Sequence, residues 1–316
     1  MKKPLIIITG PTAVGKTAVS VELAKRINGE IISADSMQVY KRMDIGTAKI
    51  TPSETDGIRH HLIDILEPDE DFNVYLFKNL AKKAIDDIYS RGNIPIIAGG
   101  TGFYIQSVLY EIDFSENEDT TSYRKSLYEL AKSRGPEYVH DMLRQVDPKS
   151  AENIHFNNVK RVVRALEFYK QTGSRISVHN EVQKNNESPY NFLYIVLNDE
   201  REKLYERINR RVDSMFADGL FNEVNTLVEG GLTRDMNSMK AIGYREFFDY
   251  FDKNATLDEV REKIKSDTRH FAKRQLTWFR REKSVTMINI NEFNYDKDAI
   301  LSHIMNLIRK KGITDE

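Results

Sequence analysis

The sequence of 316 residues contains no cysteine. Without thiols the chain forms neither a disulfide framework nor a zinc site with cysteine ligands, and this fits a reducing compartment such as the cytoplasm. The sequence also lacks any apolar run that approaches the roughly 20 residues of a membrane-spanning helix. Met1-Lys2-Lys3 leads directly into an apolar strand rather than into the hydrophobic region of a signal peptide. We therefore expect a cytoplasmic protein that does not bind a membrane.

Neither sign of charge is in excess, since 47 Lys and Arg residues stand against 48 Asp and Glu residues. The net charge therefore gives no indication of a nucleic-acid partner. The charges are nevertheless unevenly placed, because residues 261–283 hold nine Lys or Arg and three acids. Such a segment favours a basic face that binds a polyanion, although a solvated helix face is the more common reason for a charge run.

The segment 10–17 reads Gly-Pro-Thr-Ala-Val-Gly-Lys-Thr and matches the phosphate-loop pattern G-x-x-x-x-G-K-[ST]. It follows the apolar run Leu5–Ile8 and precedes apolar residues at helical spacing, which is the strand-loop-helix context that the pattern requires. Backbone N–H groups at such a helix N-terminus bind phosphate oxygens, Lys16 reaches a terminal phosphate, and the Thr17 hydroxyl holds Mg²⁺. The residues expected to bind a polyphosphate are Gly10, Thr12, Ala13, Val14, Gly15, Lys16 and Thr17.

Strands and helices alternate through the first third of the chain. Apolar runs predict strands at 30–35, 61–66 and 94–98, and helical spacing predicts a helix over 73–90 that Asp71 caps. This alternation indicates a parallel sheet with helices on its faces, and ligands bind such sheets at the carboxyl ends of the strands. The groups that should gather at this edge are Gly10–Thr17, Asp35, Asp64 and Gly99–Thr101.

The alternation stops after residue 113. From 114 to 189 the patterns are helical, and a strand at 192–197 resumes the alternation. The chain from residue 200 is again helical, apart from a strand at 284–288. We therefore predict an α/β fold, a phosphate-loop parallel sheet flanked by helices, with a helical C-terminal region. Residues 1–113 and 190–316 would form this core, and 114–189 an inserted all-helical domain.

Asp35 follows a predicted strand close to the phosphate loop. A carboxylate there can hold Mg²⁺ or accept a proton from an attacking group, but it can also simply cap the next helix. Asp64 has the character of a structural residue. A later strand ends in Ala98-Gly99-Gly100, where an ordinary NTPase or kinase would have a metal-binding Asp, so the pattern counts against routine ATP hydrolysis.

Three basic clusters lie on predicted helices. Each alone is explained by a solvated helix face, but three clusters beside a phosphate loop favour contacts with phosphate, which the arginine fork binds in a bidentate manner. Three aromatic residues can stack on bases or belong to the core. The clusters are Arg161 with Arg164, Arg207 with Arg211, and Arg269 with Lys273 and Arg280; the aromatic residues are Tyr104, Tyr244 and Trp278.

Short motifs occur in a fixed order along the chain, and together they resemble the bacterial tRNA dimethylallyltransferase (isopentenyltransferase) family from residue 4 to about 282. One departure is Lys160, where the family pattern has Gln. The motifs are Gly10–Thr17, Asp35–Tyr40, Asp44–Lys49, His60–Asp64, Gly99–Tyr104, Asn158–Glu167, Arg211–Asp213, Lys240–Tyr244, and Thr268-Arg269 with Lys273–Arg280.

This resemblance implies transfer of a dimethylallyl group from dimethylallyl diphosphate to N6 of the adenosine immediately 3′ of the anticodon in tRNA. By resemblance, Asp35 is the general base and Thr101 positions the amine or Asp35. Lys16, Thr17 and Mg²⁺, with Arg211 and Arg207, stabilise the charge on the leaving diphosphate. The adenine must be flipped out of its stack to reach Asp35.

The resemblance also implies a set of tRNA contacts, and the helical insertion is expected to clamp the anticodon stem-loop. Nothing in the sequence indicates an obligate dimer, so we expect a monomer. Three other functions stay open at this point: a prenyltransferase acting on free AMP, ADP or ATP, a phosphate-loop kinase of small molecules, and a non-catalytic RNA-binding NTP switch. The expected tRNA contacts are Asp35, Ser36, Met37, Gln38, Thr101, Lys160, Arg161, Arg164, Lys240, Gly243, Tyr244 and Arg245.

Overall fold

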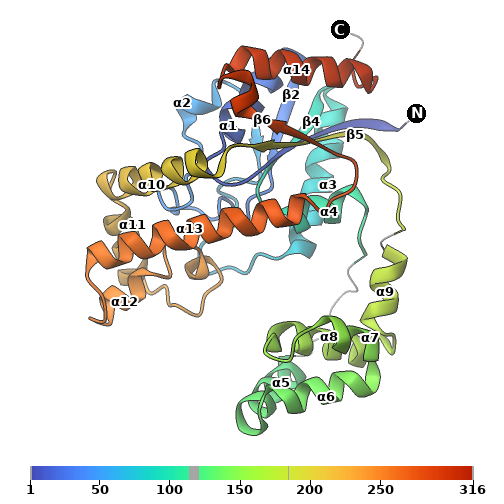
Figure 1. The fold of residues 1–316 in the computed structure, drawn as a ribbon, viewed down its shortest axis with the longest axis vertical. Helices are drawn as coiled ribbons and strands as arrows, with labels where there is room; N and C mark the ends of the chain where they lie inside the picture. The colour runs from blue at the N-terminus through green and yellow to red at the C-terminus, as the bar shows by residue number, and fades with distance from the viewer. Residues whose placement is uncertain (1, 114–120, 184, 315–316) are drawn as a thin grey trace. The chain divides into compact units, whose positions relative to one another are not determined.

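The structure, a computed structural model, describes residues 2–113, 121–183 and 185–314 (Figure 1). The chain divides into two compact units. The α/β unit comprises Met1–Leu109 and Pro189–Glu316, and the helical unit comprises Tyr110–Ser188. The predicted start of the insertion at residue 114 lies outside the described residues.

A six-stranded sheet with the order β3-β2-β4-β1-β5-β6 forms the centre of the α/β unit, and all its pairs are parallel. Residues 5–8 of the central strand have no exposed surface, because helices cover both faces of the sheet. An apolar run without alternation is the sequence signature of such a strand. The strands are β1 Lys3–Thr9, β2 Gly29–Ser33, β3 His60–His61, β4 Ile94–Gly99, β5 Tyr190–Asn198 and β6 Val285–Asn289.

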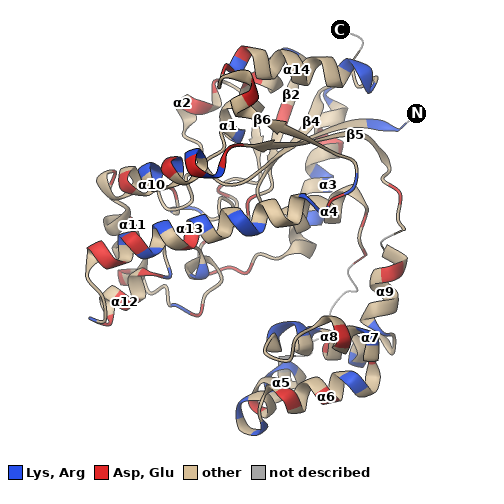
Figure 2. Ribbon diagram, in the orientation of Figure 1, with Lys and Arg blue, Asp and Glu red and all other residues tan. Residues whose placement is uncertain are grey.

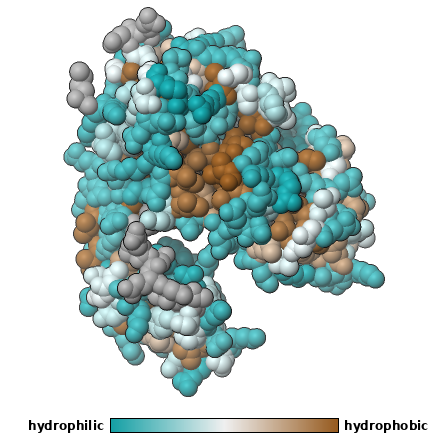
Figure 3. Space-filling view, turned by 180° about the vertical axis from the view of Figure 1, so that it is seen from behind, coloured by the Kyte–Doolittle hydropathy of each residue, from teal (hydrophilic) through white to brown (hydrophobic). Residues whose placement is uncertain are grey.

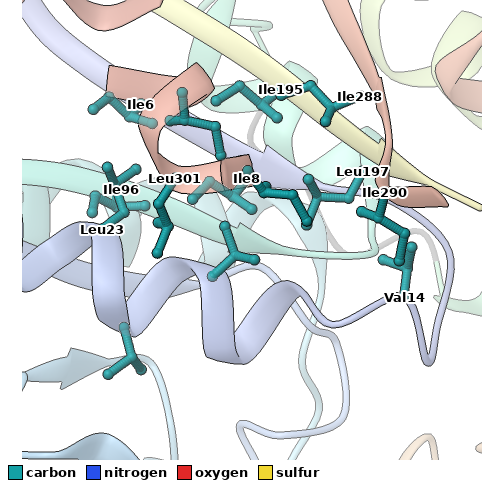
Figure 4. Close-up of a cluster of buried hydrophobic side chains, with 14 of the residues drawn as sticks. Ile6, Ile8, Val14, Leu23, Ile96, Ile195, Leu197, Ile288, Ile290 and Leu301 are labelled. Carbon is teal, nitrogen blue, oxygen red and sulfur yellow. The ribbon is translucent and has the colours of Figure 1, made fainter. Parts of the chain in front are cut away.

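Helices α1 and α14 pack together on one face of the sheet, and α3 and α4 pack together on the other (Figure 1). Figure 4 shows Leu23 of α1 and Leu301 of α14 among the isoleucines of the strands. The helices of the α/β unit are α1 Lys16–Ile27, α2 Pro52–Thr55, α3 Val74–Ser90, α4 Gly102–Leu109, α10 Arg201–Ala217, α11 Leu220–Glu229, α12 Phe247–Phe251, α13 Leu257–Phe279 and α14 Lys297–Lys310, with 3₁₀ turns at Ser238–Lys240 and Ile290–Phe293.

Two local predictions are wrong. The strand predicted over 61–66 ends at His61, because Leu62 and Asp64 adopt left-handed φ angles of 63° and 54° that turn the chain out of the sheet. Asp64 instead pairs with Lys49 at 2.5 Å, a structural role. The cap of α3 is Asn73 rather than Asp71, since the Asn73 side chain accepts a hydrogen bond from the Leu76 N–H at 3.0 Å.

The helical unit has a core of its own. Leu127, Val139, Leu143, Val162 and Leu166 are buried together. A buried carboxylate, Asp147, accepts hydrogen bonds from serines at the starts of two helices, α7 and α9, and so ties them together. The helices of this unit are α5 Thr121–Arg134, α6 Pro136–Val146, α7 Pro148–Asn153, α8 Val159–Thr172 and α9 Ile176–Gln183.

The surface of the α/β unit is mostly hydrophilic in the view of Figure 3, with a hydrophobic area near its middle. Of the helices in the described residues, none combines the length and the apolar character that crossing a bilayer requires.

Candidate active site

The phosphate loop joins the central strand β1 to α1. Gly10 has a φ of 142° and lies so close to the Leu197 carbonyl oxygen that a Cβ would overlap it. Gly15, with a φ of 97°, brings the chain into α1, which begins at Lys16. Both positions need glycine, and together they curl the loop over the carboxyl end of β1. Thr17 lies exposed in the first turn of α1, where amides at a helix N-terminus and a hydroxyl can bind an anion.

The Lys16 ammonium lies inside the curl of this loop. It donates hydrogen bonds to the carbonyl oxygens of Gly10 at 3.1 Å and Pro11 at 2.9 Å. Burial and the nearby charge of Arg211 lower the pKa of Lys16 to about 8, and Asp35 acts in the opposite direction. One cation, Arg211, and one carboxylate, Asp35, thus influence the charge of Lys16.

Asp35 follows β2 and faces the phosphate loop. Burial raises the pKa of its carboxyl group, while the Met37 N–H, which donates to Oδ1 at 2.9 Å, and the charge of Lys16 oppose that shift. The carboxylate therefore closes a tight local turn and caps no helix, since the next helix begins at Pro52. A raised pKa makes this carboxylate a stronger proton acceptor than an ordinary aspartate.

The turn after β4 lies against Asp35. The Thr101 N–H donates to the Ala34 carbonyl oxygen at 3.1 Å. Gly99 approaches the backbone of Ala34 so closely that a Cβ would overlap it. Thr101 is thus fixed beside Asp35, as the predicted convergence of strand ends requires.

Arg211 and Arg207 lie one turn apart on α10 but have different surroundings. Arg211 is close enough to Lys16 to influence its pKa. Arg207 pairs with the buried Asp199, just beyond β5, and lies over the Tyr295 ring. Arg211 is therefore the α10 arginine beside the phosphate-loop lysine, and Arg207 is held by Asp199.

Helix α13 contributes a residue that sequence reasoning missed. The Gln275 side chain accepts a hydrogen bond from the Thr12 N–H at 2.9 Å and donates one to the Gly100 carbonyl oxygen at 3.0 Å. Gln275 is only 6% exposed. The sequence feature that could have identified Gln275 is its position: an uncharged polar residue on the apolar stripe of a helix whose other face is basic.

The segment after Asp35 is held within its own loop. Gln38 receives a hydrogen bond from the Ser33 hydroxyl and donates to the carbonyl oxygens of Thr47 and Ala48. Ser36 and Met37 are half-buried beside it. These residues directly follow Asp35 in the chain, and both ends of the Gln38 amide have hydrogen-bond partners.

Tyr244 is fully buried, so its ring is not open to stack on a base. The ring lies against Gly46, and its hydroxyl donates to Glu223 at 2.6 Å. Glu223 also accepts hydrogen bonds from the backbone N–H groups of Asp44, Ile45 and Gly46. The side chain of Tyr244 therefore fixes the 44–46 turn.

The remaining predicted contacts near Tyr244 face outward or bridge elements. Lys240 is exposed, and the Gly243 N–H donates to Glu246. Arg245 bridges Glu246 and Asp267 at 2.8 and 2.9 Å. Figure 2 shows further Lys and Arg residues along α13.

The other predicted aromatic contacts differ in exposure. Tyr104 is buried, with its ring stacked on Phe77 at 4.5 Å between centroids, so it belongs to the core. Trp278, on α13, is 38% exposed and can stack on a base. In the helical unit, Lys160 and Arg161 are exposed and Arg164 is half-buried on α8.

Sequence comparisons identify similar proteins along nearly the whole chain. The family model described as IPP transferase matches residues 38–282, and that described as isopentenyl transferase matches residues 3–70. A tRNA dimethylallyltransferase of Lachnoclostridium phytofermentans is 56% identical over 98% of this chain and 99% of its own. One of Acetivibrio thermocellus is 51% identical over 94% of this chain and 95% of its own.

Solved structures are also similar to this chain over most of its length. The tRNA isopentenylpyrophosphate transferase of Bacillus halodurans is 47% identical and has a TM-score of 0.74, with 98% of this chain and 97% of that chain covered. A eukaryotic dimethylallyltransferase acting on tRNA is 32% identical with a TM-score of 0.78, covering 91% of this chain and 74% of that one. The chain belongs to the tRNA dimethylallyltransferase family.

Proposed function

We propose that this chain transfers the dimethylallyl group of dimethylallyl diphosphate to N6 of the adenosine immediately 3′ of the anticodon in tRNA. The observation that carries the proposal is a phosphate loop paired with a half-buried carboxylate, since Asp35 and Lys16 lie close enough to influence each other's pKa. The loop suits a diphosphate and the carboxylate suits a proton, the two groups that prenyl transfer to an amine releases. Relatives that match the chain nearly end to end carry the same activity in their names.

In this reaction N6 of adenine attacks C1 of the dimethylallyl group. The N–C bond forms, the C1–O bond breaks, and its electron pair leaves with the diphosphate. N6 loses one proton, which Asp35 accepts. Thr101, fixed beside Asp35 through the Ala34 carbonyl group, holds the amine in line with that carboxylate.

The negative charge that develops on the diphosphate is met by preorganised positive groups. Lys16, Arg211 and the amides at the start of α1 converge on the loop. Stabilising a leaving group in this manner commonly contributes more to catalysis than any other single effect. Arg207, one turn earlier on α10, pairs with Asp199 and adds positive charge near Arg211.

The oxygen atoms around the loop fit Mg²⁺, which prefers hydroxyl, carboxylate and phosphate ligands. Thr17 presents its hydroxyl at the exposed start of α1. Elsewhere in the described residues, no group of three His, Asp or Glu side chains is arranged to hold a metal ion. We assign the ion to Thr17 and the diphosphate, where it would supply additional positive charge to the leaving group.

Basic side chains on α8 and α13 and the loops at 36–38 and 240–245 are the tRNA contacts in this proposal. The target adenine must leave its stack, because a stacked amine cannot reach a carboxylate inside the site. Trp278 offers an exposed ring for a base. We further propose that the protein acts as a monomer in the cytoplasm.

Mass spectrometry of tRNA incubated with the protein, dimethylallyl diphosphate and Mg²⁺ tests the proposal. We expect one dimethylallyl group on the adenosine 3′ of the anticodon. Parallel incubations contain AMP, ADP or ATP in place of tRNA, or ATP in place of the prenyl donor. Prenylation of a free nucleotide alone, or phosphoryl transfer from ATP to a small molecule, would contradict the proposal.

A further inference from the structure

Gln275 joins two loops of the site from a distant part of the chain. Its partners Thr12 and Gly100 are 263 and 175 residues away in sequence. Thr12 belongs to the phosphate loop, and Gly100 directly precedes Thr101. A single buried side chain therefore spans the two loops that, under the proposed function, hold the leaving group and the attacking amine.

Both ends of the Gln275 amide are in use. The carbonyl oxygen accepts from an N–H group and the amino group donates to a carbonyl oxygen, so the position needs one acceptor and one donor on the same planar group. Glutamate satisfies the first bond and opposes the second, and methionine satisfies neither. Because Gln275 is only 6% exposed, water cannot readily replace a hydrogen-bond partner that is lost there.

The bond to Thr12 also gives one amide of the phosphate loop a protein partner. The Thr12 N–H points to Gln275 in this structure, while the amides at the start of α1 and the Lys16 ammonium remain at the loop's interior. Gln275 therefore contacts the loop at Thr12 and sets where the loop lies relative to the 99–102 turn, while the hydrogen bonds of Lys16 to Gly10 and Pro11 are separate from this contact.

We propose that Gln275 is a positioning residue that fixes the distance between the departing diphosphate and the attacking amine. This inference rests on the proposed function. The broken C1–O bond lies on the side of the phosphate loop, and the forming N–C bond lies on the side of Thr101 and Asp35. In-line displacement depends steeply on this alignment, because a shift of about 1 Å costs about 10²-fold in rate.

The test compares Gln275→Met with wild type in single-turnover prenylation of tRNA. We expect the rate constant to fall about 50-fold, while the affinity for inorganic pyrophosphate, measured by calorimetry, stays within about 3-fold. Tyr89→Phe is the matched control. It removes a side-chain hydrogen bond to the Pro4 carbonyl oxygen at the opposite end of β1, and any loss of stability there should leave the rate unchanged.

Gln275→Glu supplies a second measurement, the pH dependence of the prenylation rate. A purely structural role of Gln275 would not change this pH dependence. Protonated glutamic acid can again donate to the Gly100 carbonyl oxygen, so the rate of this variant relative to wild type should rise as the pH falls from 8 to 6. A flat ratio, an unchanged rate in Gln275→Met, or parallel losses of rate and pyrophosphate affinity would overturn the inference. If wild type itself does not prenylate tRNA, the proposed function fails and this inference fails with it.

Discussion

The charges around the phosphate loop depend on one another at the scale of single side chains. Burial lowers the pKa of Lys16 and raises the pKa of Asp35, so each group is held closer to its neutral form than in water. Arg211 adds to the effect on Lys16. The site thus combines a lysine that loses its charge near pH 8 with a carboxylate of increased basicity.

Replacing Asp35 by Ala should abolish prenyl transfer while tRNA affinity stays within a few-fold. The variant lacks the proton acceptor but retains the basic surfaces. Asp35→Asn is the closer control, because an amide still accepts from the Met37 N–H yet cannot take a proton. Single-turnover assays and tRNA binding are the measurements. Activity in either variant would remove Asp35 from the role of base.

The pH profile of kcat/KM for dimethylallyl diphosphate should be bell-shaped. Activity falls as the pH drops through the raised pKa of Asp35, since the base becomes protonated. It also falls as the pH rises through about 8, since Lys16 loses its charge in the free enzyme. Lys16→Arg should be slower yet lack this alkaline fall, because arginine stays charged. Persistence of the alkaline fall in Lys16→Arg would assign it to another group.

The residues whose signal is local could be predicted from the sequence. Lys16 and Thr17 belong to the phosphate-loop pattern, which identifies both the residues and their role in binding phosphate. Asp35 directly follows an apolar run. Gln275 and Glu223 escaped prediction because their partners lie far away in sequence, and no pattern marks a pair that only folding creates. For Tyr244 the sequence allows either stacking on a base or a place in the core, and folding buries its ring against Gly46.

At the scale of elements, α13 has two roles along one length. Its buried side carries Ala272, Gln275 and Phe279, and its other side carries exposed basic residues and Trp278. The same helix therefore contacts the catalytic loops and presents a surface for a polyanion. In the helical unit, α8 likewise buries Val162 and Leu166 and exposes Arg161.

Arg161→Ala and Arg164→Ala should each weaken tRNA binding and reduce its dependence on salt. A lost phosphate contact lowers the slope of log affinity against log salt by roughly one. Titrations at several salt concentrations measure the slope. Arg134→Ala on α5, whose side chain lies over the Tyr138 ring, is the control and should leave the slope unchanged. A slope unaltered in the α8 variants would show that these arginines do not contact phosphate.

Most elements could be predicted from apolar runs and helical spacing, because burial on a sheet or a helix face imposes those periods. The segment 61–66 is an exception. Residues 61–66 look like a strand by composition, yet Leu62 and Asp64 take left-handed angles. Asp64 bonds to Lys49 and the neighbouring backbone follows the 38–40 loop, so tertiary contacts overrule local preference.

At the scale of the whole molecule, a buried carboxylate ties the edge of the sheet together. Burial by itself would raise the pKa of Glu30, but hydrogen bonds from Arg91, His61 and Asn93 lower it from 4.5 to about 2. Since the folded pKa is depressed, the stabilisation is present above pH 4.5 and is lost as the pH falls toward 2. The sequence shows each of these residues, but it does not predict that they contact one another. Their contact depends on the order of the strands in the sheet, which no local pattern specifies.

Glu30→Gln should lower the free energy of unfolding by about 2 kcal/mol at pH 7, the typical effect of removing a charged partner from buried hydrogen bonds. The difference from wild type should shrink as the pH falls from 4.5 toward 2. Urea denaturation across this range is the measurement. Glu22→Gln, which breaks a surface pair with Lys25, should cost less than about 1 kcal/mol. An equal cost for both variants would argue against the network.

The turn at 44–46 has a consequence for how this protein can change over generations. A larger residue at position 46 collides with Tyr244, and loss of Glu223 leaves three backbone N–H groups and a tyrosine hydroxyl without their acceptor. A substitution at Gly46, Glu223 or Tyr244 therefore requires compensating substitutions at the other two positions. Among descendants of this chain they should persist together or be exchanged together, although nearly 200 residues separate the first from the last.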